Sequence, residues 1–297
     1  VLAQRYEAVV ANPPYLGGRG VTGVPKVLAP LAKGKYAIGK IDAYAMFVIL
    51  SNNLAVDHGV FSSVVKEEIL YLPSLSELRK FLLEKNKVSS IWRIGSGAFS
   101  VRAAAYVANK NATPGRVKIV RSSRGDAPKL GVMSEWDQKT FDSLPYCIID
   151  DDLPSSVVEI LKLKPRLGDF TTAKQGLSTT DNERFLRYWW EISASELQKS
   201  RENPEKKWHP HNKGGSPRKW YGNVIHAIDY RDNGSFLLDY VREKYPKISD
   251  PEFIIRNRSS YFKESITWSR VRSSGKRVGF RLSPEGHVFD TAAMCFS

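Results

Sequence analysis

Residues 6–15 read YEAVVANPPY, and this stretch decides the expected fold. Its first six residues form a short apolar run that ends at Asn12, which is typical of a buried strand. Pro13 and Pro14 stop further strand pairing and fix an extended turn. We therefore expect a buried strand whose carboxyl end carries a rigid turn, with Tyr15 directly after it.

Helices and strands alternate beyond this turn. Residues 42–56 are apolar on nearly every side, which predicts a buried helix that Asp42 caps. Residues 74–85 predict an amphipathic helix that opens with a capping box from Ser74 to Glu77. Strands are expected over residues 60–65, 88–94, 103–109 and 116–121. This alternation predicts an α/β domain with a parallel sheet, and the last strands are joined by a turn short enough for a hairpin. Four or five strands are fewer than a complete open sheet normally has.

The composition changes along the chain. Residues 16–40 hold six glycines without any period, which predicts a long loop of the kind that is usually functional. Near residue 150 an acidic cluster is followed by a predicted helix over residues 155–163, and six of the seven tryptophans lie after residue 130. We therefore expect a domain boundary within about ten residues of position 150.

Charge and cysteine content limit the function classes. The 297 residues include 45 Lys+Arg against 31 Asp+Glu, a net charge of +14, which favours a polyanionic partner. The two cysteines exclude a disulfide framework and a cysteine-based zinc cluster, and they suit a reducing cytoplasm. No apolar run reaches about 18 residues, so we expect no transmembrane span and no membrane partner.

The turn after the first strand carries the strongest chemical signal. An amino group conjugated to a ring is a weak nucleophile because its lone pair is delocalised. The side-chain oxygen of Asn12 and the carbonyl of Pro13 can both accept hydrogen bonds from such a group and draw its nitrogen toward tetrahedral geometry. Pro14 stiffens the turn, so both acceptors are preorganised. Tyr15 offers a flat face for a base or an amide. An ordinary Asn-Pro turn after a strand is the alternative.

This turn resembles the catalytic motif of amino-group methyltransferases that use S-adenosylmethionine (SAM). Residues 176–190 and 261–276 resemble the target-recognition region of the adenine-specific DNA methyltransferases of BREX phage-defence systems (PglX-like), relatives of type IIG restriction–modification enzymes. The resemblance spans residues 6–297. It implies a partial Rossmann-like methyltransferase sheet of α/β class in residues 1–150 and an α+β target-recognition domain in residues 151–297. Double-stranded DNA would be the substrate, and other defence-system subunits are candidate partners.

The resemblance also implies roles for individual residues. The catalytic group would be Asn12, Pro13, Pro14 and Tyr15, which hold and activate adenine N6. Phe99 would be a second aromatic against the flipped base, with an ordinary loop aromatic as the alternative. Asp42 and Phe47 would lie beside the cofactor, with helix capping and core packing as the alternatives.

Two features depart from the family pattern. The glycine-rich cofactor loop should lie upstream of the motif, but the sequence begins eleven residues before Asn12 without a methionine. We therefore expect that the N-terminal half of the catalytic domain is missing and that this chain alone is incomplete. Residues 64–72, VVKEEILYL, also differ from the apolar, tryptophan-containing segment expected there.

A basic stretch near the C-terminus is the candidate DNA contact. Residues 255–281 hold eight Lys and Arg against a single acid, Glu264. Cations neutralise phosphates, arginine reads guanine, and interleaved aromatics can stack or wedge. The residues predicted to bind DNA are Arg256, Arg258, Lys263, Trp268, Arg270, Arg272, Lys276 and Arg281. A solvated surface is the alternative for each of them.

Two smaller patterns predict loops rather than sites. His209 and His211 lie two residues apart without a supporting cysteine or a well-spaced carboxylate, so we expect no metal there. Residues 213–216, KGGS, lack the strand and the spacing of a phosphate-binding loop.

Three functions remain open on these grounds. The first is an N6-adenine DNA methyltransferase that transfers methyl from SAM by direct in-line attack. The second is a methyltransferase of protein glutamine or RNA, against which the basic residues 151–297 count. The third is a catalytically incomplete DNA-recognition fragment.

Overall fold

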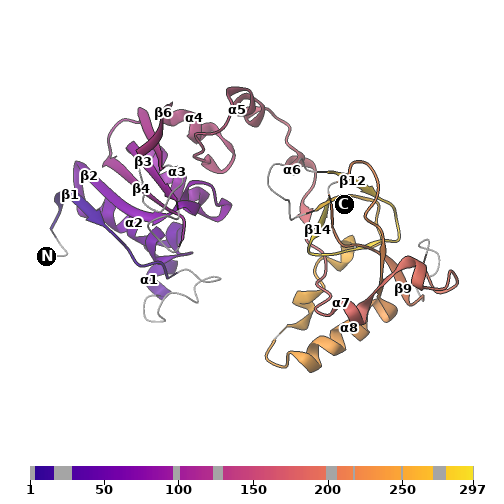
Figure 1. Cartoon of the computed structure of the whole chain (residues 1–297). Coiled ribbons are helices and arrows are strands. Elements are labelled where there is room, and N and C mark those ends of the chain that lie inside the picture. The colour runs from indigo at the N-terminus through magenta and orange to yellow at the C-terminus, as the bar shows by residue number, and fades with distance from the viewer. Residues whose placement is uncertain are drawn as a thin grey trace. The chain divides into compact units, whose positions relative to one another are not determined.

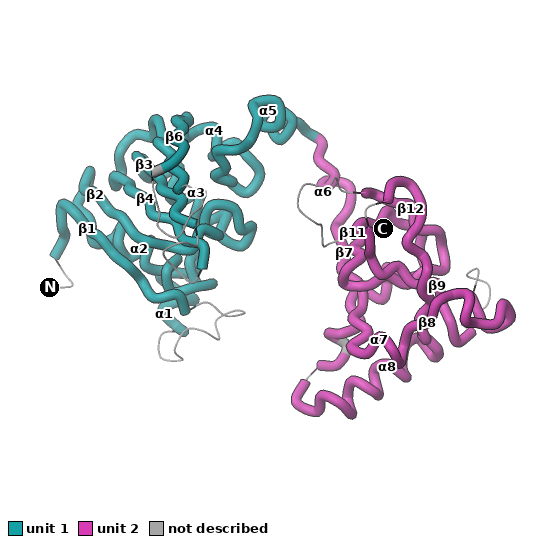
Figure 2. The backbone as a smooth tube through the Cα atoms, viewed as in Figure 1, with its two compact units in different colours: residues 1–164 teal, residues 165–297 magenta. Residues whose placement is uncertain are grey.

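The structure is a computed structural model, and it describes residues 4–16, 29–95, 101–122, 130–198, 206–216, 218–248, 250–269 and 279–296. The chain forms two compact units, residues 1–164 and 165–297, each with its own hydrophobic core (Figure 2). The division lies later than the expected boundary near residue 150. The reason is that Ile149 and Val158 are buried in the core of unit 1, and Leu153 and Leu161 pack against that core.

Unit 1 contains a six-stranded sheet in the order β1-β2-β4-β3-β5-β6 (Figure 1). Its strands are β1 (Tyr6–Ala11), β2 (Ala55–Lys66), β3 (Asn86–Gly95), β4 (Ala103–Lys110), β5 (Arg116–Ser122) and β6 (Leu130–Asp137). β1 is parallel to β2 and β3 is parallel to β5, while β4 and β6 are antiparallel to their neighbours. The sheet is therefore mixed rather than wholly parallel. The short connection from β3 to β4 accounts for this, because it can only join antiparallel neighbours.

The helices of unit 1 largely follow the sequence expectations. They are α1 (Ala29–Lys33), α2 (Ala43–Leu54), α3 (Ser76–Lys85), α4 (Gln138–Ser143) and α5 (Ser155–Lys162). α2 packs on β1 and β2 and buries Tyr44, Ala45 and Val48, as its apolar sequence predicts. The predicted capping box is wrong: a 3-10 turn, Pro73–Leu75, comes before α3, and no side chain caps its start. α1 also lies within the segment predicted to be a loop.

Unit 2 is an α+β unit built on two four-stranded sheets, β13-β9-β10-β8 and β12-β11-β14-β7. The strands are β7 (Ala173–Lys174), β8 (Leu186–Tyr188), β9 (Trp208–Asn212), β10 (His226–Asp229), β11 (Ser265–Ser269), β12 (Arg281–Ser283), β13 (Val288–Phe289) and β14 (Ala293–Phe296). The helices are α6 (Leu167–Phe170), α7 (Asn182–Phe185) and α8 (Arg231–Lys244). Leu237, Leu238 and Val241 bury one side of α8 in the core. The α/β class expected for the chain is confirmed.

The two histidines predicted to lie in a loop are instead buried on a strand. His209 and His211 belong to β9 and are 2% and 0% exposed. No group of three His, Cys, Asp or Glu side chains in the described ranges is arranged to hold a metal ion. Within those ranges, no helix is long and apolar enough to cross a membrane.

Candidate active site

The Asn-Pro-Pro-Tyr turn lies at the carboxyl end of β1, where this strand runs parallel to β2. Asn12 is exposed, and its side chain makes no hydrogen bond within the described part of the chain. Pro13 is buried and fixes the turn against the unit. The side-chain oxygen of Asn12 is therefore available as an acceptor at the strand end, which is where the sequence predicts it to act.

The carboxylate of Asp42 holds the exit of this turn. One of its oxygens, Oδ1, accepts a hydrogen bond from the backbone N–H of Leu16 at 3.1 Å, directly after Tyr15. The other, Oδ2, accepts from Nζ of Lys66 at 2.8 Å, at the end of β2. Asp42 occupies the N-cap position of α2 but makes no capping bond, so its predicted capping role is wrong. The carboxylate instead connects the turn to β2.

Aromatic contacts fix the ring of Tyr15. It meets the ring of Tyr44 edge-on, with centroids 5.9 Å apart, and Nζ of Lys66 lies 5.8 Å from both ring centroids. The hydroxyl of Tyr15 is buried without a hydrogen-bond partner in the described ranges. Burial, followed by the negative charge of Asp42, raises the pKa of Tyr15. The ring is therefore neutral and contacts two neighbours, Tyr44 on α2 and Lys66 on β2.

Lys66 is a site residue that the sequence analysis did not select. The sequence contained a signal for it, because Lys66 and Glu67 interrupt an otherwise apolar strand end in residues 64–72. From the sequence, residues 64–72 are interpreted only as a departure from the family pattern. Ion pairing with Asp42 and with two arginines accounts for the charges found there.

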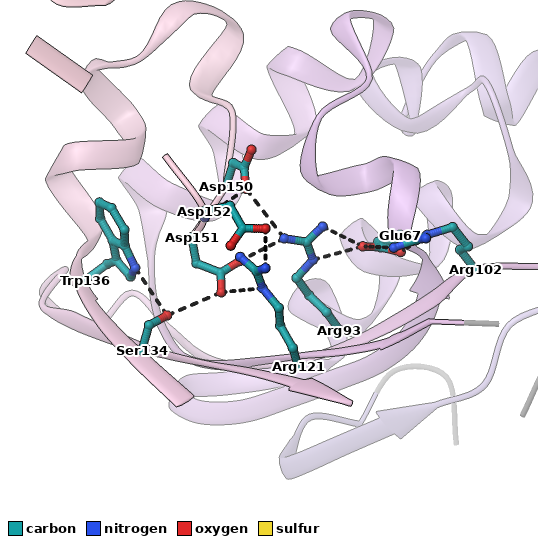
Figure 3. A network of polar contacts seen from close by, with 9 residues as sticks. All are labelled: Glu67, Arg93, Arg102, Arg121, Ser134, Trp136, Asp150, Asp151 and Asp152. Carbon is teal, nitrogen blue, oxygen red and sulfur yellow. Dashed lines mark hydrogen bonds and ion pairs between the residues drawn. The ribbon is translucent and has the colours of Figure 1, made fainter. Parts of the chain in front are cut away.

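A buried ion network lies at the ends of β2, β3 and β5 (Figure 3). Glu67 is 1% exposed; Nε of Arg93 donates to its Oε1 at 2.9 Å and Nε of Arg102 to its Oε2 at 2.6 Å. Asp151 accepts from Nη1 of Arg93 and from Nε of Arg121, both at 2.8 Å. Burial would raise the pKa values of both carboxyl groups, but the arginine hydrogen bonds and charges outweigh it and lower them. The network therefore keeps both carboxylates ionised.

This network fixes both sides of the segment that contains Phe99. Arg93 lies near the end of β3 and Arg102 directly before β4, and the backbone N–H of Glu67 donates to the carbonyl of Arg102 at 2.9 Å. Phe99 itself lies outside the described residues. Its base-stacking role stays a prediction, with both ends of its segment held in place.

Arg79 connects α3 to two other parts of unit 1. Its guanidinium is fully buried and donates to the carbonyls of Ile69, Leu72, Tyr146 and Cys147 at 2.8–3.1 Å. Burial lowers the pKa of Arg79 to about 10, so the group remains charged at neutral pH. These hydrogen bonds hold residues 69–72, which follow Glu67, close to residues 146–147, which precede Asp150.

The residues predicted beside a cofactor are Asp42 and Phe47. Each carboxylate oxygen of Asp42 already accepts one hydrogen bond within the protein, and its predicted role beside the cofactor stays a prediction. Phe47 lies in α2 and is partly exposed, so its predicted role is neither supported nor contradicted. We assign no complete cofactor cradle to the described residues.

The predicted DNA-binding residues have different surroundings. Arg270, Arg272 and Lys276 lie outside the described residues. Lys263 is exposed, whereas Trp268 is half-buried and contacts Phe280 and Phe296.

Three arginines among the predicted DNA-binding residues lie in the described ranges, and their guanidinium groups are less available to contact DNA. Arg256 is bonded to Gln175 and to the carbonyl of Phe253 at 3.0 Å. Nε and Nη2 of Arg258 are buried without a hydrogen-bond partner in the described ranges. Arg281 is only 2% exposed, on β12, so its guanidinium does not reach the surface as a phosphate contact requires.

Comparisons with known proteins agree with the resemblance drawn from the sequence. The Eco57I restriction-modification methylase family matches residues 2–99. The adenine-specific methyltransferase BrxX of Escherichia coli O9:H4 (strain HS) is 30% identical over 307 residues, which cover 98% of this chain and 24% of BrxX. The adenine-specific methyltransferase PglX of Lacticaseibacillus casei (strain Zhang) is 28% identical over 321 residues, covering 98% of this chain and 26% of PglX. The chain thus spans about a quarter of the length of these relatives.

Two solved structures share the fold over nearly the whole chain. The type IIL restriction–modification enzyme MmeI, in complex with DNA, aligns with a TM-score of 0.59 and 13% identity, over 97% of this chain and 40% of MmeI. A nuclease-deletion mutant of the type ISP enzyme LlaGI, in complex with a DNA substrate mimic, aligns with a TM-score of 0.50 and 11% identity, over 97% of this chain and 35% of LlaGI. The chain therefore shares its fold with parts of these two structures.

Proposed function

We propose that this chain, which resembles PglX-like adenine-specific methyltransferases along 98% of its length, is part of an enzyme that methylates adenine N6 in double-stranded DNA. The observation that carries the proposal is the rigid Asn-Pro-Pro-Tyr turn at the end of β1, with the side chain of Asn12 exposed and unpaired within the described residues. Unit 1 would hold the reacting base, and unit 2 would recognise the target. The biological setting would be restriction–modification or phage defence.

The turn would activate the amino group of adenine by accepting hydrogen bonds. The Asn12 side-chain oxygen and the Pro13 carbonyl would each accept one of the two N–H groups and localise the nitrogen lone pair. The adenine must leave the base stack to reach them, and the held ring of Tyr15 would pack on its face. SAM would supply the methyl group. Asn12 and the Pro13 carbonyl would hold N6 while it receives the methyl group, and the proton that N6 gives up would pass to solvent.

Two features of the molecule support DNA as the substrate. The net charge of +14 suits a polyanion, and a chain of this charge gains affinity by releasing counterions from phosphates. Similarity to MmeI, whose structure contains DNA, extends over both units. A methyltransferase of protein glutamine has no comparable use for a separate basic unit, whereas RNA is also a polyanion and is distinguished from DNA by where the label appears in the assay.

Replacement of Asn12 tests the catalytic proposal. We expect Asn12→Ala to lower methyl transfer from radiolabelled SAM to plasmid DNA by about 100-fold, the typical cost of losing one preorganised polar group at a reacting centre. The assay uses the chain in its natural full-length context, and the label should appear as N6-methyladenine. Asn53→Ala, the same change on α2, is the control and should retain activity.

Full methylation by Asn12→Ala, or label on protein or RNA instead of DNA, would contradict this function. A second function follows from the length of the chain, which spans only about a quarter of its curated relatives. The chain by itself would then be a DNA-recognition portion. Calorimetric titration with SAM and with duplex DNA distinguishes the two, since a recognition portion binds only the DNA.

A further inference from the structure

A glycine-lined groove of about 830 Å³ lies in unit 2, built from two segments that flank residue 217. Lys213, Gly214, Gly215 and Ser216 form one side, and Gly222–His226 form another, with Arg218 between them. Nδ2 of Asn223 donates to the carbonyl of Ser216 at 2.7 Å and ties the two sides together. The segment that was predicted to be a simple loop therefore shapes a concave surface.

The shape of the groove depends on its glycines. Gly214 has a φ of +90°, and a Cβ there would come within 2.8 Å of the carbonyl oxygen of Ala292. Gly222 has a φ of +113°, and a Cβ there would meet Cδ of Arg218 at 2.8 Å. These positions require glycine for both reasons. The sequence thus keeps the backbone of the groove accessible and lets the side chain of Arg218 pass beside it.

A column of parallel rings adjoins the groove. His226 lines the groove, Tyr188 stacks on His226 with centroids 5.2 Å apart, and Trp190 stacks on Tyr188 at 4.6 Å with an interplanar angle of 4°. Pairing of β8 with β10 puts Tyr188 opposite His226. Trp190, the last ring of the column, is 56% exposed. Trp189, itself 52% exposed, meets Trp190 nearly perpendicularly with centroids 5.6 Å apart, so exposed aromatic surface continues from the column.

Exposed aromatics and unpaired cations complete this surface. Trp220 and Tyr221 are each 70% exposed. Arg218 and Lys219 are exposed, and their side chains make no ion pair or hydrogen bond within the described part of the chain. Residues 206–228 contain five Lys and Arg and no Asp or Glu. Glu191, the acid beside the column, accepts a hydrogen bond from the backbone N–H of Tyr188 at 2.8 Å.

We infer that this groove, with the ring column and the residues 218–221, is a duplex-DNA contact surface of unit 2, distinct from the basic stretch of residues 255–281. Arg218 and Lys219 neutralise backbone phosphates, and the exposed rings make apolar contacts with the nucleotides. Lys213 has a structural role in the side of the groove instead. Its Nζ donates to Oδ1 of Asn182 at 2.5 Å and lies 3.7 Å from Oδ2 of Asp290. The inference rests on the proposed function for its choice of DNA as the polyanion.

Salt-dependent DNA binding tests this surface without any need for catalysis. The probe is a fluorescein-labelled 30-base-pair duplex of mixed sequence, followed by anisotropy from about 50 to 200 mM NaCl. Each phosphate contact contributes about 0.9 to the slope of log K against log salt. We expect Arg218→Ala/Lys219→Ala to reduce the slope by about 1.8 and to weaken binding at least tenfold at about 0.1 M salt.

A matched control removes the same charges elsewhere in unit 2. Arg242→Ala/Lys247→Ala also deletes one exposed arginine and one exposed lysine outside the proposed surface and should leave the slope unchanged; unlike Arg218, Arg242 pairs with Asp239 at 2.8 Å. Trp220→Ala is expected to weaken binding about tenfold at unchanged slope, because an aromatic contact releases no counterions. Circular dichroism confirms that each variant is folded.

The inference is overturned if Arg218→Ala/Lys219→Ala binds with the wild-type slope and affinity, or if hairpin RNA is bound in preference to the duplex. Methyl transfer that is lost in Asn12→Ala while this double variant binds normally would leave the proposed function intact and reject only this surface. If binding depends on Arg218 and Lys219 but no methyl transfer occurs, the DNA contact surface is supported and the proposed function is rejected.

Discussion

Arg281 carries a charge inside unit 2 rather than on its surface. The residue is 2% exposed, and Nε and Nη2 have no hydrogen-bond partner within the described ranges. Its closest polar contact there is Oγ of Ser269, at 3.4 Å from Nη1. Burial lowers the pKa of Arg281, which means that the charged form is less favourable there than in water. A buried unpaired charge of this kind costs stability.

Replacement of Arg281 by an apolar side chain should therefore be tolerated. We expect Arg281→Met to leave duplex affinity within about twofold of wild type and to raise the free energy of unfolding by about 1 kcal/mol. Urea denaturation and the anisotropy assay measure the two quantities. A tenfold loss of affinity in a folded variant would instead return Arg281 to the DNA contacts predicted from the sequence.

Glu67 adds ion pairs at the ends of β2, β3 and β4, where the strands also pair through their backbones. Its carboxylate is buried between Arg93 and Arg102. Loss of one partner in a buried ion pair typically costs 3–5 kcal/mol, because the other charge is left uncompensated. Since Arg102 is itself 64% exposed at its side chain, the cost at Glu67 belongs at the lower end of that range.

Glu67→Gln is expected to lower the free energy of unfolding of unit 1 by about 3 kcal/mol at pH 7. The folded-state pKa of Glu67 is lowered, so its stabilisation is present above the ordinary glutamate pKa and is lost as pH falls through the folded value. The difference between wild type and variant should thus shrink below about pH 4. Urea unfolding between pH 3.5 and pH 7 measures it.

Glu135→Gln provides the matched control for this prediction. Glu135 pairs with Arg116 at 3.2 Å, and both side chains are well exposed, so this change should cost only about 0.5 kcal/mol. Equal losses from Glu67→Gln and Glu135→Gln would show that burial of Glu67 contributes little.

Local sequence patterns predicted most elements of unit 1 but not the contacts between them. Apolar runs and periodicity gave β1, α2, α3 and the β3–β4 hairpin, because these depend on neighbouring residues. β6 was missed because residues 130–137, LGVMSEWD, show no clear alternation. The candidate site shows the same difference between local features, which the sequence predicts, and contacts between elements, which it does not. The strand-end location of Asn12 was predictable, whereas the pairing of Asp42 with Lys66 depends on a fold that brings residues 24 positions apart together.

The two units differ in where they bury titratable groups. Four of the five histidines lie in unit 2, at positions 209, 211, 226 and 287, and all four have lowered pKa values with burial as the leading cause. The remaining histidine, His58, is exposed in unit 1. Both units bury carboxylates with lowered pKa values, Glu67 and Asp151 in unit 1 and Asp290 in unit 2, so the histidines are what distinguishes unit 2. Acid should therefore act on the two units in different pH ranges.

We expect unit 2 to lose stability first as the pH falls. A histidine whose folded pKa is lowered takes up its proton only on unfolding, so stability falls as pH drops below the unfolded value of about 6.5. Each such histidine contributes up to about 1.4 kcal/mol per pH unit. Pulse proteolysis in urea, with peptides assigned to each unit by mass spectrometry, measures both midpoints at pH 7.5 and pH 5.5. Parallel shifts of the two midpoints would contradict this difference.

The late division between the units determines where recognition specificity can be exchanged between related chains. Ile149, Leu153, Val158 and Leu161 complete the core of unit 1, and Asp151 pairs with Arg93 and Arg121 on its sheet. A graft that replaces everything after residue 150 would remove Leu153, Val158, Leu161 and Asp151 and expose the core of unit 1. A junction at residue 165 keeps them, so a foreign unit joined there would leave the core of unit 1 whole.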